Sequence, residues 1–243
     1  MRAMILAAGL GTRLRPLTDD RPKALVEVAG HTLLEITLRR LAAFGIREVI
    51  VNVHHFAELV VEYLQKNNHF GMQVEISQEE ILLDTGGGLK KAAWFFAGKE
   101  PFLLHNVDVI STIDLARMLQ VHNENQSLAT LAVQKRETSR RLLFDSELQL
   151  CGRQTGRQPV ELVRPVKEAA PFAFSGVHVI SPPFLGRMTE DGTFSIINSY
   201  LRLAGEGEKI SAFRANEYYW RDLGKPENVA QAAQDLKEEK FQI

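Results

Sequence analysis

A glycine-rich segment near the amino terminus carries most of the residues suited to phosphate chemistry. It reads L-A-A-G-L-G-T-R-L-R-P, from Leu6 to Pro16, and continues the apolar run Ala3–Ala8. A strand that ends at glycines lets the backbone approach a ligand closely, and a helix start offers free N–H groups to an anion. Neither a dinucleotide loop nor a P-loop fits, because the third glycine and the Gly-Lys-Ser/Thr ending are absent. The segment indicates a phosphate site of another kind.

Basic side chains crowd the same region and could clamp several phosphates. They are Arg13, Arg15, Arg21 and Lys23, and two prolines stiffen the segment that carries them. Arginine suits bidentate contacts with phosphate, whereas lysine acts as a compact point charge. The alternative is a solvated basic loop, which is the commoner meaning of a charge run. The strand and glycine turn that precede these residues favour the phosphate clamp.

Two aspartates are candidate ligands for a metal ion. Asp108 follows the short apolar run Phe102–His105, and Asp222 follows the aromatic run Tyr218–Trp220. If the fold brings the two carboxylates together, they can hold Mg²⁺, which prefers oxygen ligands and often shares them with substrate phosphates. The alternative for each aspartate alone is a cap on a turn or a helix. Together with the phosphate clamp, the pair favours a magnesium site.

A second glycine run, Asp84-Thr85-Gly86-Gly87-Gly88, precedes the segment Leu89–Phe96, which predicts a helix. Glycines at this place permit close approach of a flat base or a phosphate, and a simple turn is the alternative. Other site chemistries are not indicated. The histidines lack metal-ligand spacing, and the chain has no Gly-x-Ser-x-Gly elbow of a serine hydrolase.

The composition narrows the class of protein. With 243 residues, 45% of them hydrophobic, the chain can bury a sizeable core. A formal net charge of −1 gives no electrostatic case for binding nucleic acid. The single Cys151 excludes an internal disulfide framework. No apolar run reaches the roughly 18 residues of a membrane span and no signal-peptide pattern opens the chain, so we expect a cytoplasmic protein without a membrane partner.

The elements that must position these residues alternate between strand and helix in the first half. The patterns predict strands at Ala3–Ala8, Glu48–Val53, Gln73–Ser77, Phe102–His105 and Leu128–Val133, and helices around Leu34–Ala42, at Phe56–Leu64 and after a cap at Asp114. This alternation predicts an α/β fold with a mainly parallel mixed sheet and helices on both faces. Ligands of such sheets bind beyond the carboxyl ends of the strands, where Gly9–Arg15 and Asn106–Asp108 would lie.

The second half of the chain is less regular. Leu142–Phe144 and Leu148–Cys151 predict a hairpin, and the polar segment Gly152–Pro171 predicts a loop. Phe172–Val179 and Lys209–Phe213 predict two further strands. No internal repeat or linker divides the sequence. We therefore expect one domain over residues 1–243, in which residues 142–171 form a partly separate lobe of hairpin and loop.

The first motif resembles the signature of the sugar-1-phosphate nucleotidyltransferases. That signature has the form G-x-G-T-R-L-x-P-L-T followed by P-K. This chain has Gly9-Leu10-Gly11-Thr12-Arg13-Leu14-Arg15-Pro16-Leu17-Thr18 and then Pro22-Lys23. Weaker similarity continues to Asp222 and the last helix, so the resemblance covers nearly the whole chain.

The resemblance implies a Rossmann-like three-layer α/β/α sandwich and an enzyme that joins a nucleoside triphosphate to a sugar 1-phosphate and releases pyrophosphate. It implies Mg²⁺ held by Asp108 and Asp222, and catalytic roles for Arg13 and Lys23. The implied nucleotide-binding residues are Leu6, Ala7, Ala8, Gly9, Gly11, Thr12, Arg13, Thr85, Gly87, Gly88 and Asn106. The implied sugar-phosphate residues are Arg164, Ser175 and Gly176, with the lobe near the sugar. A monomer or a small homo-oligomer is expected.

The chain departs from the family pattern at three places. The family usually has glycine between the asparagine and aspartate of the metal turn, and here Val107 intervenes. If that turn needs a positive φ, valine fits poorly. Arg164, in Val163-Arg164-Pro165, replaces the lysine of a Glu-Lys-Pro motif, whose glutamate is missing. No β-helix repeats follow, so the chain does not match the bifunctional acetyltransferase type.

Within the family, a short chain with D-T-G-G-G resembles the uridylyltransferases that act on N-acetylmuramic acid 1-phosphate in cell-wall recycling. Mannose-1-phosphate guanylyltransferases and phosphocholine cytidylyltransferases are the alternatives. A regulatory protein that binds nucleotide without turnover is an alternative of another class, suggested by Val107. A P-loop kinase would need the Gly-Lys-Ser/Thr ending that the first loop lacks.

Overall fold

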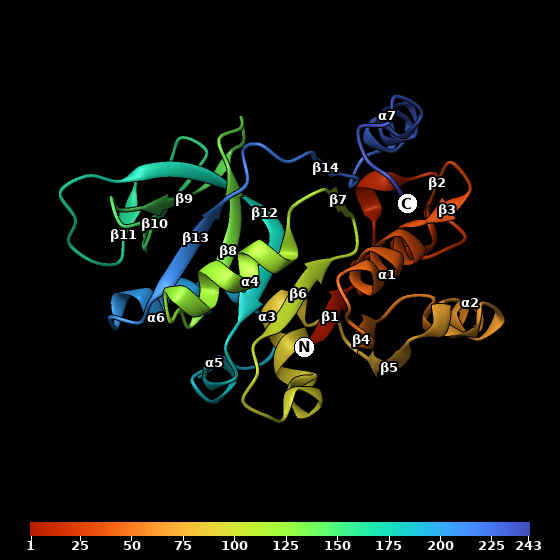
Figure 1. Ribbon diagram of the computed structural model, residues 1–243, viewed down its shortest axis with the longest axis horizontal. Helices are drawn as coiled ribbons and strands as arrows, with labels where there is room; N and C mark the ends of the chain where they lie inside the picture. Colours follow the sequence, from red (N-terminus) through yellow and green to blue (C-terminus); the bar gives the residue numbers. More distant parts are fainter.

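A ten-stranded mixed sheet forms the centre of the computed structural model, which describes residues 1–243 (Figure 1). Its strands are β1 (Arg2–Leu6), β4 (Glu48–Val53), β5 (Gln73–Gln78), β6 (Phe102–Asn106), β8 (Ala129–Gln134), β9 (Arg140–Phe144), β10 (Leu150–Thr155), β11 (Glu161–Leu162), β12 (Ala170–Ile180) and β13 (Ile210–Arg214). The main path runs β11-β10-β9-β12-β6-β1-β4-β5, and β8 joins β12 to β13.

The direction of the strands places the sequence motifs at one edge of this sheet. β1 is parallel to β4 and β6, and β4 is parallel to β5. β12 is antiparallel to both β6 and β8, so β8 runs in the same direction as β6. The carboxyl ends of β1, β6 and β8 therefore share an edge, which is where ligands bind in open α/β sheets.

Helices cover both faces of the sheet, which confirms the predicted three-layer sandwich. One face carries α1 (Leu33–Ala43), α2 (Ala57–Lys66) and α4 (Leu115–Glu124), and the other carries α3 (Asp84–Lys91), α5 (Pro183–Gly186) and α6 (Ile196–Gly205). Successive side chains of β1 point to opposite faces of the sheet, so Ala3 and Ile5 pack in one apolar cluster and Met4 and Leu6 pack in the other. The predicted cap at Asp114 is confirmed, since its carboxylate accepts a hydrogen bond from the Arg117 amide at 2.9 Å.

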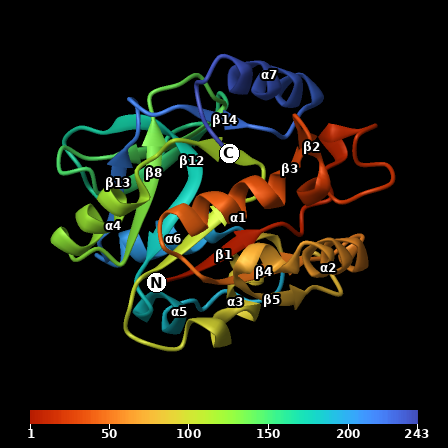
Figure 2. The same ribbon diagram turned by 45° about the vertical axis from the view of Figure 1, so that its right-hand side comes forward.

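Small elements complete the fold, and several of them lie at the ligand edge. They are β2 (Glu27–Val28) with β3 (His31–Thr32), β7 (Val109–Ser111) with β14 (Trp220–Asp222), α7 (Pro226–Lys237), and the 3₁₀ turns η1 (Thr12–Leu14), η2 (Lys23–Leu25), η3 (Asn68–Gly71) and η4 (Ala93–Phe96). Figure 2 shows α7 and β14 together on this side of the molecule. No helix is long and apolar enough to cross a membrane.

The carboxylate of Asp235 in α7 anchors the carboxyl-terminal segment. The side chain is fully buried, and it accepts hydrogen bonds from Tyr219 at 2.8 Å, from Arg221 at 2.8 Å and from Lys240 at 3.0 Å. Burial opposes ionisation, but hydrogen bonds from Lys240, Tyr219 and their neighbours hold the pKa of Asp235 well below its usual range. A charged, fully bonded carboxylate thus fixes α7 beside β14.

The second glycine run lies inside a helix, which corrects the prediction of a helix that starts only at Leu89. α3 begins at Asp84 and contains all three glycines. A Cβ on Gly86 would overlap the Phe194 ring, and a Cβ on Gly87 would overlap the Gly192 carbonyl oxygen. Packing against the segment before α6 therefore outweighs the low helix propensity of glycine.

We expect Gly86→Ala to destabilise the protein by about 1–3 kcal/mol, because the added methyl group must displace Phe194 in a packed interior. Urea unfolding would measure the loss. Gly186→Ala is the matched control, since Gly186 is also helical but a Cβ there meets nothing within 4 Å. Equal stabilities for the two variants would contradict the packing role of Gly86.

The lobe of residues 142–171 is more regular than its sequence indicates. The predicted loop Gly152–Pro171 is wrong at both ends, because β10 extends to Thr155 and β12 begins at Ala170, with β11 between them. Gly152 permits this hairpin, since a Cβ there would overlap the Glu161 carbonyl oxygen. β12 pairs with β9 near its start and with β6 near its end, so the lobe is continuous with the central sheet.

Three buried histidines make stability depend on pH. Burial lowers the pKa of His105 and His122 to about 4 and that of His178 to about 3. Their unfolded-state pKa is about 6.5. Because the folded values are lower, their stabilising effect is fully present above pH 6.5 and is lost as the pH falls toward 4.

We expect the free energy of unfolding, measured with urea, to drop between pH 7 and pH 5. Each of these histidines contributes a slope of up to about 1.4 kcal/mol per pH unit below pH 6.5. His122→Gln should flatten the slope by about one proton, since the amide can still bond Thr130 and Ser181, which contact His122 at 2.9 Å. An unchanged slope in that variant would contradict the assignment for His122.

Candidate active site

The loop after β1 folds back on itself and needs glycine at one position. Gly11 has φ +65°, in the left-handed region, and a Cβ there would lie 3.0 Å from Thr18 Cγ2 and 3.3 Å from Lys23 Cβ. The Thr18 hydroxyl donates to the Gly11 carbonyl oxygen at 2.9 Å. A side chain at position 11 would therefore strain the backbone and push Lys23 outward.

A cavity of about 320 Å³ opens between this loop and the end of β6. Its lining residues are Gly9, Leu10, Gly11, Thr12, Arg13, Leu14, Lys23, Leu82, Asp108 and Gly224. The fold thus brings Arg13 and Lys23 of the predicted phosphate clamp and one predicted metal ligand, Asp108, into a single cavity. The remaining basic residues of the clamp stay outside it, because Arg15 pairs with Asp19 and Arg21 pairs with Asp20.

An ion pair between Lys23 and Asp108 lies at the bottom of the site. Lys23 Nζ is 3.0 Å from Asp108 Oδ2, and the two side chains are only 15% and 11% exposed. A Cβ on Gly9 would come within 3.4 Å of the same ammonium group. The lysine therefore supplies a positive charge directly against a carboxylate that faces the cavity.

Asp222 reaches Asp108 through the pairing of β14 with β7. Asp222 lies opposite Val109 in this ladder, and the Leu223 amide donates to the Asp108 carbonyl oxygen at 2.7 Å. Asp222 Oδ1 accepts a hydrogen bond from the Gly224 amide at 2.7 Å, which is the turn contact given above as the alternative. The backbones of these two aspartates, from opposite halves of the chain, are thus neighbours at the ligand edge, although only Asp108 lines the cavity.

Arg13 approaches the same turn from the glycine loop. A Cβ on Gly224 would lie 3.0 Å from Arg13 Nη2 and 2.7 Å from Asp222 Oδ1. Glycine at position 224 therefore leaves room for both the Arg13 guanidinium and the Asp222 carboxylate beside this turn. The cavity is thus lined by the charges of Arg13, Lys23 and Asp108, and Asp222 is next to it beside Gly224.

The donor set fits a hard divalent cation that shares its ligands with phosphate. No three His, Cys, Asp or Glu side chains gather anywhere in the structure, so a closed all-protein metal cage is not present. Two carboxylates that leave the other positions to substrate oxygens are a usual arrangement for Mg²⁺. The ammonium group of Lys23 on Asp108 already shows that this carboxylate takes a cation at short range.

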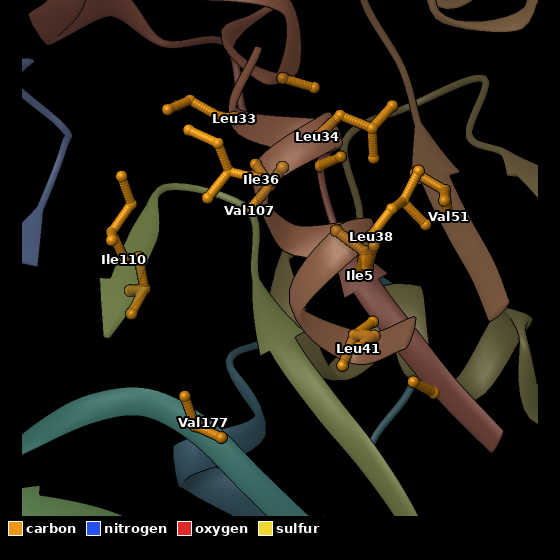
Figure 3. Close-up of a cluster of buried hydrophobic side chains, with 14 of the residues drawn as sticks. Ile5, Leu33, Leu34, Ile36, Leu38, Leu41, Val51, Val107, Ile110 and Val177 are labelled. Carbon is orange, nitrogen blue, oxygen red and sulfur yellow. The ribbon is translucent and has the colours of Figure 1, made fainter. Parts of the chain in front are cut away.

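Val107 does not disturb the turn between β6 and β7, so the poor fit expected for valine at this position does not occur. Its φ is not positive, its side chain is fully buried, and its amide donates to the Leu6 carbonyl oxygen at 3.1 Å. Figure 3 shows Val107 in the same apolar cluster as Ile36 and Leu38 of α1. The valine therefore contributes to the core instead of straining the turn.

A buried polar pair that the sequence analysis missed holds the loop after β1. The Ala7 amide donates to Asn52 Oδ1 at 2.7 Å, and Asn52 Nδ2 donates to Glu79 Oε1 at 2.7 Å. Glu79 Oε2 then accepts from the Leu83 amide at 2.9 Å. Both side chains are 2% exposed. The available signal was Asn52 within a run from Val49 to Val53 whose other residues are all apolar.

The second glycine run is close to this pair but faces protein. A Cβ on Gly88 would lie 2.8 Å from both Asn52 Nδ2 and Glu79 Oε1. Thr85 Oγ1 accepts a hydrogen bond from the Ile196 amide at 3.0 Å, and Gly87 packs on Gly192. Leu82, which is just before this glycine run in the sequence, does line the cavity. Contact of Thr85, Gly87 and Gly88 with a nucleotide stays a prediction, as does contact of the buried residues Leu6, Ala7 and Ala8.

The residues expected at the sugar phosphate separate into two groups. Ser175 and Gly176 lie in the bulge of β12, where Gly176 has φ +75° and a Cβ there would be 3.0 Å from Asn106 Nδ2. Arg164 points into the lobe instead, where it donates to Asp145 at 2.5 Å and to the Leu150 carbonyl oxygen at 3.0 Å. The role of Arg164 at the sugar phosphate stays a prediction, and in this structure its guanidinium contacts only groups of the lobe.

Comparison with known proteins defines the family. Residues 2–142 match the family model described as nucleotidyl transferase. The chain is 36% identical, over 97% of both chains, to an N-acetylmuramate alpha-1-phosphate uridylyltransferase of Caulobacter vibrioides. It is 28% identical to a mannose-1-phosphate guanyltransferase of Yarrowia lipolytica, over 94% of this chain and 62% of that one. The protein belongs to the nucleotidyl transferase family, and within it to the sugar-1-phosphate nucleotidyltransferases.

The fold is found again among solved structures. The crystal structure of HddC from Yersinia pseudotuberculosis in complex with GMP-PN superposes with a TM-score of 0.78 at 22% identity, covering 97% of this chain and 99% of that one. This similarity confirms the Rossmann-like architecture of the nucleotide-sugar transferases.

Proposed function

We propose that the protein transfers a uridylyl group from UTP to N-acetylmuramic acid 1-phosphate, giving the UDP-sugar and pyrophosphate. The observation that carries this proposal is the 36% identity to the Caulobacter vibrioides uridylyltransferase, which extends over 97% of both chains. The cavity supports it, because the glycine loop, Arg13, Lys23 and Asp108 line one site at the ligand edge of the sheet.

The charges around the cavity suit attack of one phosphate on another. An oxygen of the sugar phosphate attacks the α-phosphorus of the nucleotide, a P–O bond forms, and the bond to the departing pyrophosphate breaks. The attacking oxygen is already anionic, so no side chain has to remove a proton. The barrier comes from repulsion between anions and from charge on the leaving group, which positively charged side chains reduce by position and electrostatics. Arg13 would stabilise the leaving pyrophosphate, and Lys23 would bridge the reacting phosphates.

Asp108 and Asp222 are the residues that would hold Mg²⁺. When bound, the ion neutralises phosphate charge and orients the triphosphate. Gly224 keeps the Asp222 carboxylate in place through its amide hydrogen bond, and Leu223 ties the backbone of this segment to Asp108. These bonds hold the Asp222 carboxylate and the Asp108 backbone in place, and Lys23 holds the Asp108 carboxylate.

A matrix of four nucleoside triphosphates against several sugar 1-phosphates, followed by pyrophosphate release, tests the proposal. UTP with N-acetylmuramic acid 1-phosphate should give the largest kcat/KM. Highest activity with GTP and mannose 1-phosphate would instead support the guanylyltransferase assignment suggested by the Yarrowia lipolytica relative. Nucleotide binding without turnover on any acceptor would support a regulatory protein.

A further inference from the structure

An arginine outside the cavity lining stands at the same edge of the sheet. Arg136 comes two residues after β8, whose carboxyl end lies on the same side as that of β6. Its Nη2 donates to the Phe174 carbonyl oxygen at 2.6 Å, and its guanidinium lies 3.8 Å above the centre of the Trp220 ring. The Trp220 indole in turn donates to the Ser175 carbonyl oxygen at 2.8 Å. Arg136 is thus held between β12 and β14.

This guanidinium is close to the candidate metal ligands but has no acidic partner of its own. It forms no ion pair, and its Nε is buried without a hydrogen-bond partner. Burial lowers the pKa of Arg136, and the negative charge of Asp222 opposes that effect. Binding of an anion beside Arg136 would be favourable because it would give the unused donors hydrogen-bond partners. Buried polar groups almost always have such partners in native proteins.

Two neighbouring polar atoms are also left without partners. Ser175 Oγ and Asn106 Oδ1 are both buried and make no hydrogen bond. They come from the bulge of β12 and the end of β6, which touch each other, since a Cβ on Gly176 would lie 3.0 Å from Asn106 Nδ2. Missing partners therefore concentrate where β6, β12 and β14 meet, on the side of the metal ligands away from the glycine loop.

Three charged side chains lie in order beside the segment from Trp220 to Gly224. Arg136 stacks on Trp220 at one end, Arg13 lies against Gly224 at the other, and Asp222 is between them. From Trp220 to Asp222 the segment is extended and spans roughly 7 Å, and it bends at Gly224. Attack in line requires the nucleophile and the leaving group on opposite sides of the α-phosphorus. With Arg13 on the side of the leaving pyrophosphate, Arg136 is on the side of the nucleophile.

We propose that Arg136 binds the 1-phosphate of the acceptor sugar, the role expected above for Arg164. The inference rests on the proposed nucleotidyl transfer to a sugar 1-phosphate. Arginine suits the role because its planar group can stack on an aromatic ring and still donate two hydrogen bonds to phosphate. Trp220 and the Phe174 carbonyl oxygen hold Arg136 in place before the acceptor arrives.

Steady-state kinetics of Arg136→Gln test the proposal, with UTP and N-acetylmuramic acid 1-phosphate as substrates. The KM for the sugar phosphate should rise by roughly 10- to 100-fold, as expected for loss of a charge-assisted hydrogen bond, while the KM for UTP changes less than about twofold. Arg136→Lys should recover part of the loss. Arg140→Gln is the matched control, because Arg140 is an exposed arginine four residues further along, at the start of β9. An equal rise in both KM values, or no change in either, would overturn the role of Arg136.

Direct binding separates this proposal from the proposed function. Trp94→Phe leaves Trp220 as the single tryptophan, and Trp94 is exposed on η4, outside the site. In this background, N-acetylmuramic acid 1-phosphate should change the Trp220 fluorescence, and calorimetry should give a Kd that Arg136→Gln weakens at least about tenfold. A wild type without turnover on any substrate pair would refute the proposed function, while this binding difference would still support Arg136. Equal Kd values for the Arg136 and Arg140 variants, or no binding by the wild type, would refute the role of Arg136 in binding the sugar phosphate.

Discussion

Lys23→Ala is expected to lower kcat by on the order of 10²- to 10³-fold, the usual loss when one preorganised positive or hydrogen-bonding group is removed from a reacting phosphate or carbonyl. Lys23 Nζ lies 3.0 Å from Asp108 and lines the cavity, so alanine removes the one lysine charge that faces the substrate site. Pyrophosphate release under saturating substrates would measure the effect. Arg21→Ala is the control, because Arg21 pairs only with the exposed Asp20.

The same variant should bind divalent cations more tightly when no nucleotide is present. In the wild type, the ammonium group occupies one side of the Asp108 carboxylate, and its removal frees that oxygen. We expect the Kd for Mn²⁺, measured by electron paramagnetic resonance, to fall by roughly 3- to 10-fold, the equivalent of one modest ion pair. Near-normal turnover in Lys23→Ala would refute its catalytic role, and an unchanged Kd would refute competition at Asp108.

Asp222→Asn is expected to raise the Mg²⁺ concentration needed for half-maximal activity by at least about tenfold. The substitution keeps the shape of the side chain, and its amide oxygen can still accept the hydrogen bond from Gly224. What changes is the charge, on which the affinity of an oxygen site for Mg²⁺ depends most. A magnesium titration of pyrophosphate release would measure the shift.

The control for this variant is Glu217→Gln, which removes one exposed carboxylate from the segment just before β14. It should leave the magnesium titration unchanged, because Glu217 is outside the cavity. Thermal unfolding of both variants would show that neither has lost the fold. A magnesium titration of Asp222→Asn that matched the wild type would place the second metal ligand elsewhere.

The order of the elements could be predicted because local patterns decide it. The apolar run at β1 and the helical spacing in α2 each depend on residues that are close in sequence. The glycines of α3 could not be understood in this way, since their reason is contact with Phe194 and Gly192, far along the chain. The strands of the lobe were underestimated for a related reason, because pairing between β10 and β11 depends on a glycine that admits a facing backbone.

The same distinction between local patterns and long-range contacts applies to the candidate site. The glycine loop, Lys23 and Asp108 could be predicted, since a continuous motif and a strand end carry them. The buried pair of Asn52 and Glu79 could not, because a single polar residue in an apolar strand does not reveal its partner. The contacts of Arg164 and Arg136 depend on which carbonyl oxygen of another strand each side chain meets, and sequence spacing carries no information about that.

The attachment of β14 makes catalytic competence separable from global folding. Asp222 is held by a three-residue ladder with β7 and by the docking of α7, outside the ten-stranded sheet. Local unfolding of this carboxyl-terminal unit would withdraw one carboxylate and the Gly224 turn beside Arg13, while the glycine loop and Lys23 remained folded. The fraction of catalytically competent molecules would then depend on the opening equilibrium of this unit and not on the stability of the core. Amide hydrogen exchange at β14 would measure that equilibrium.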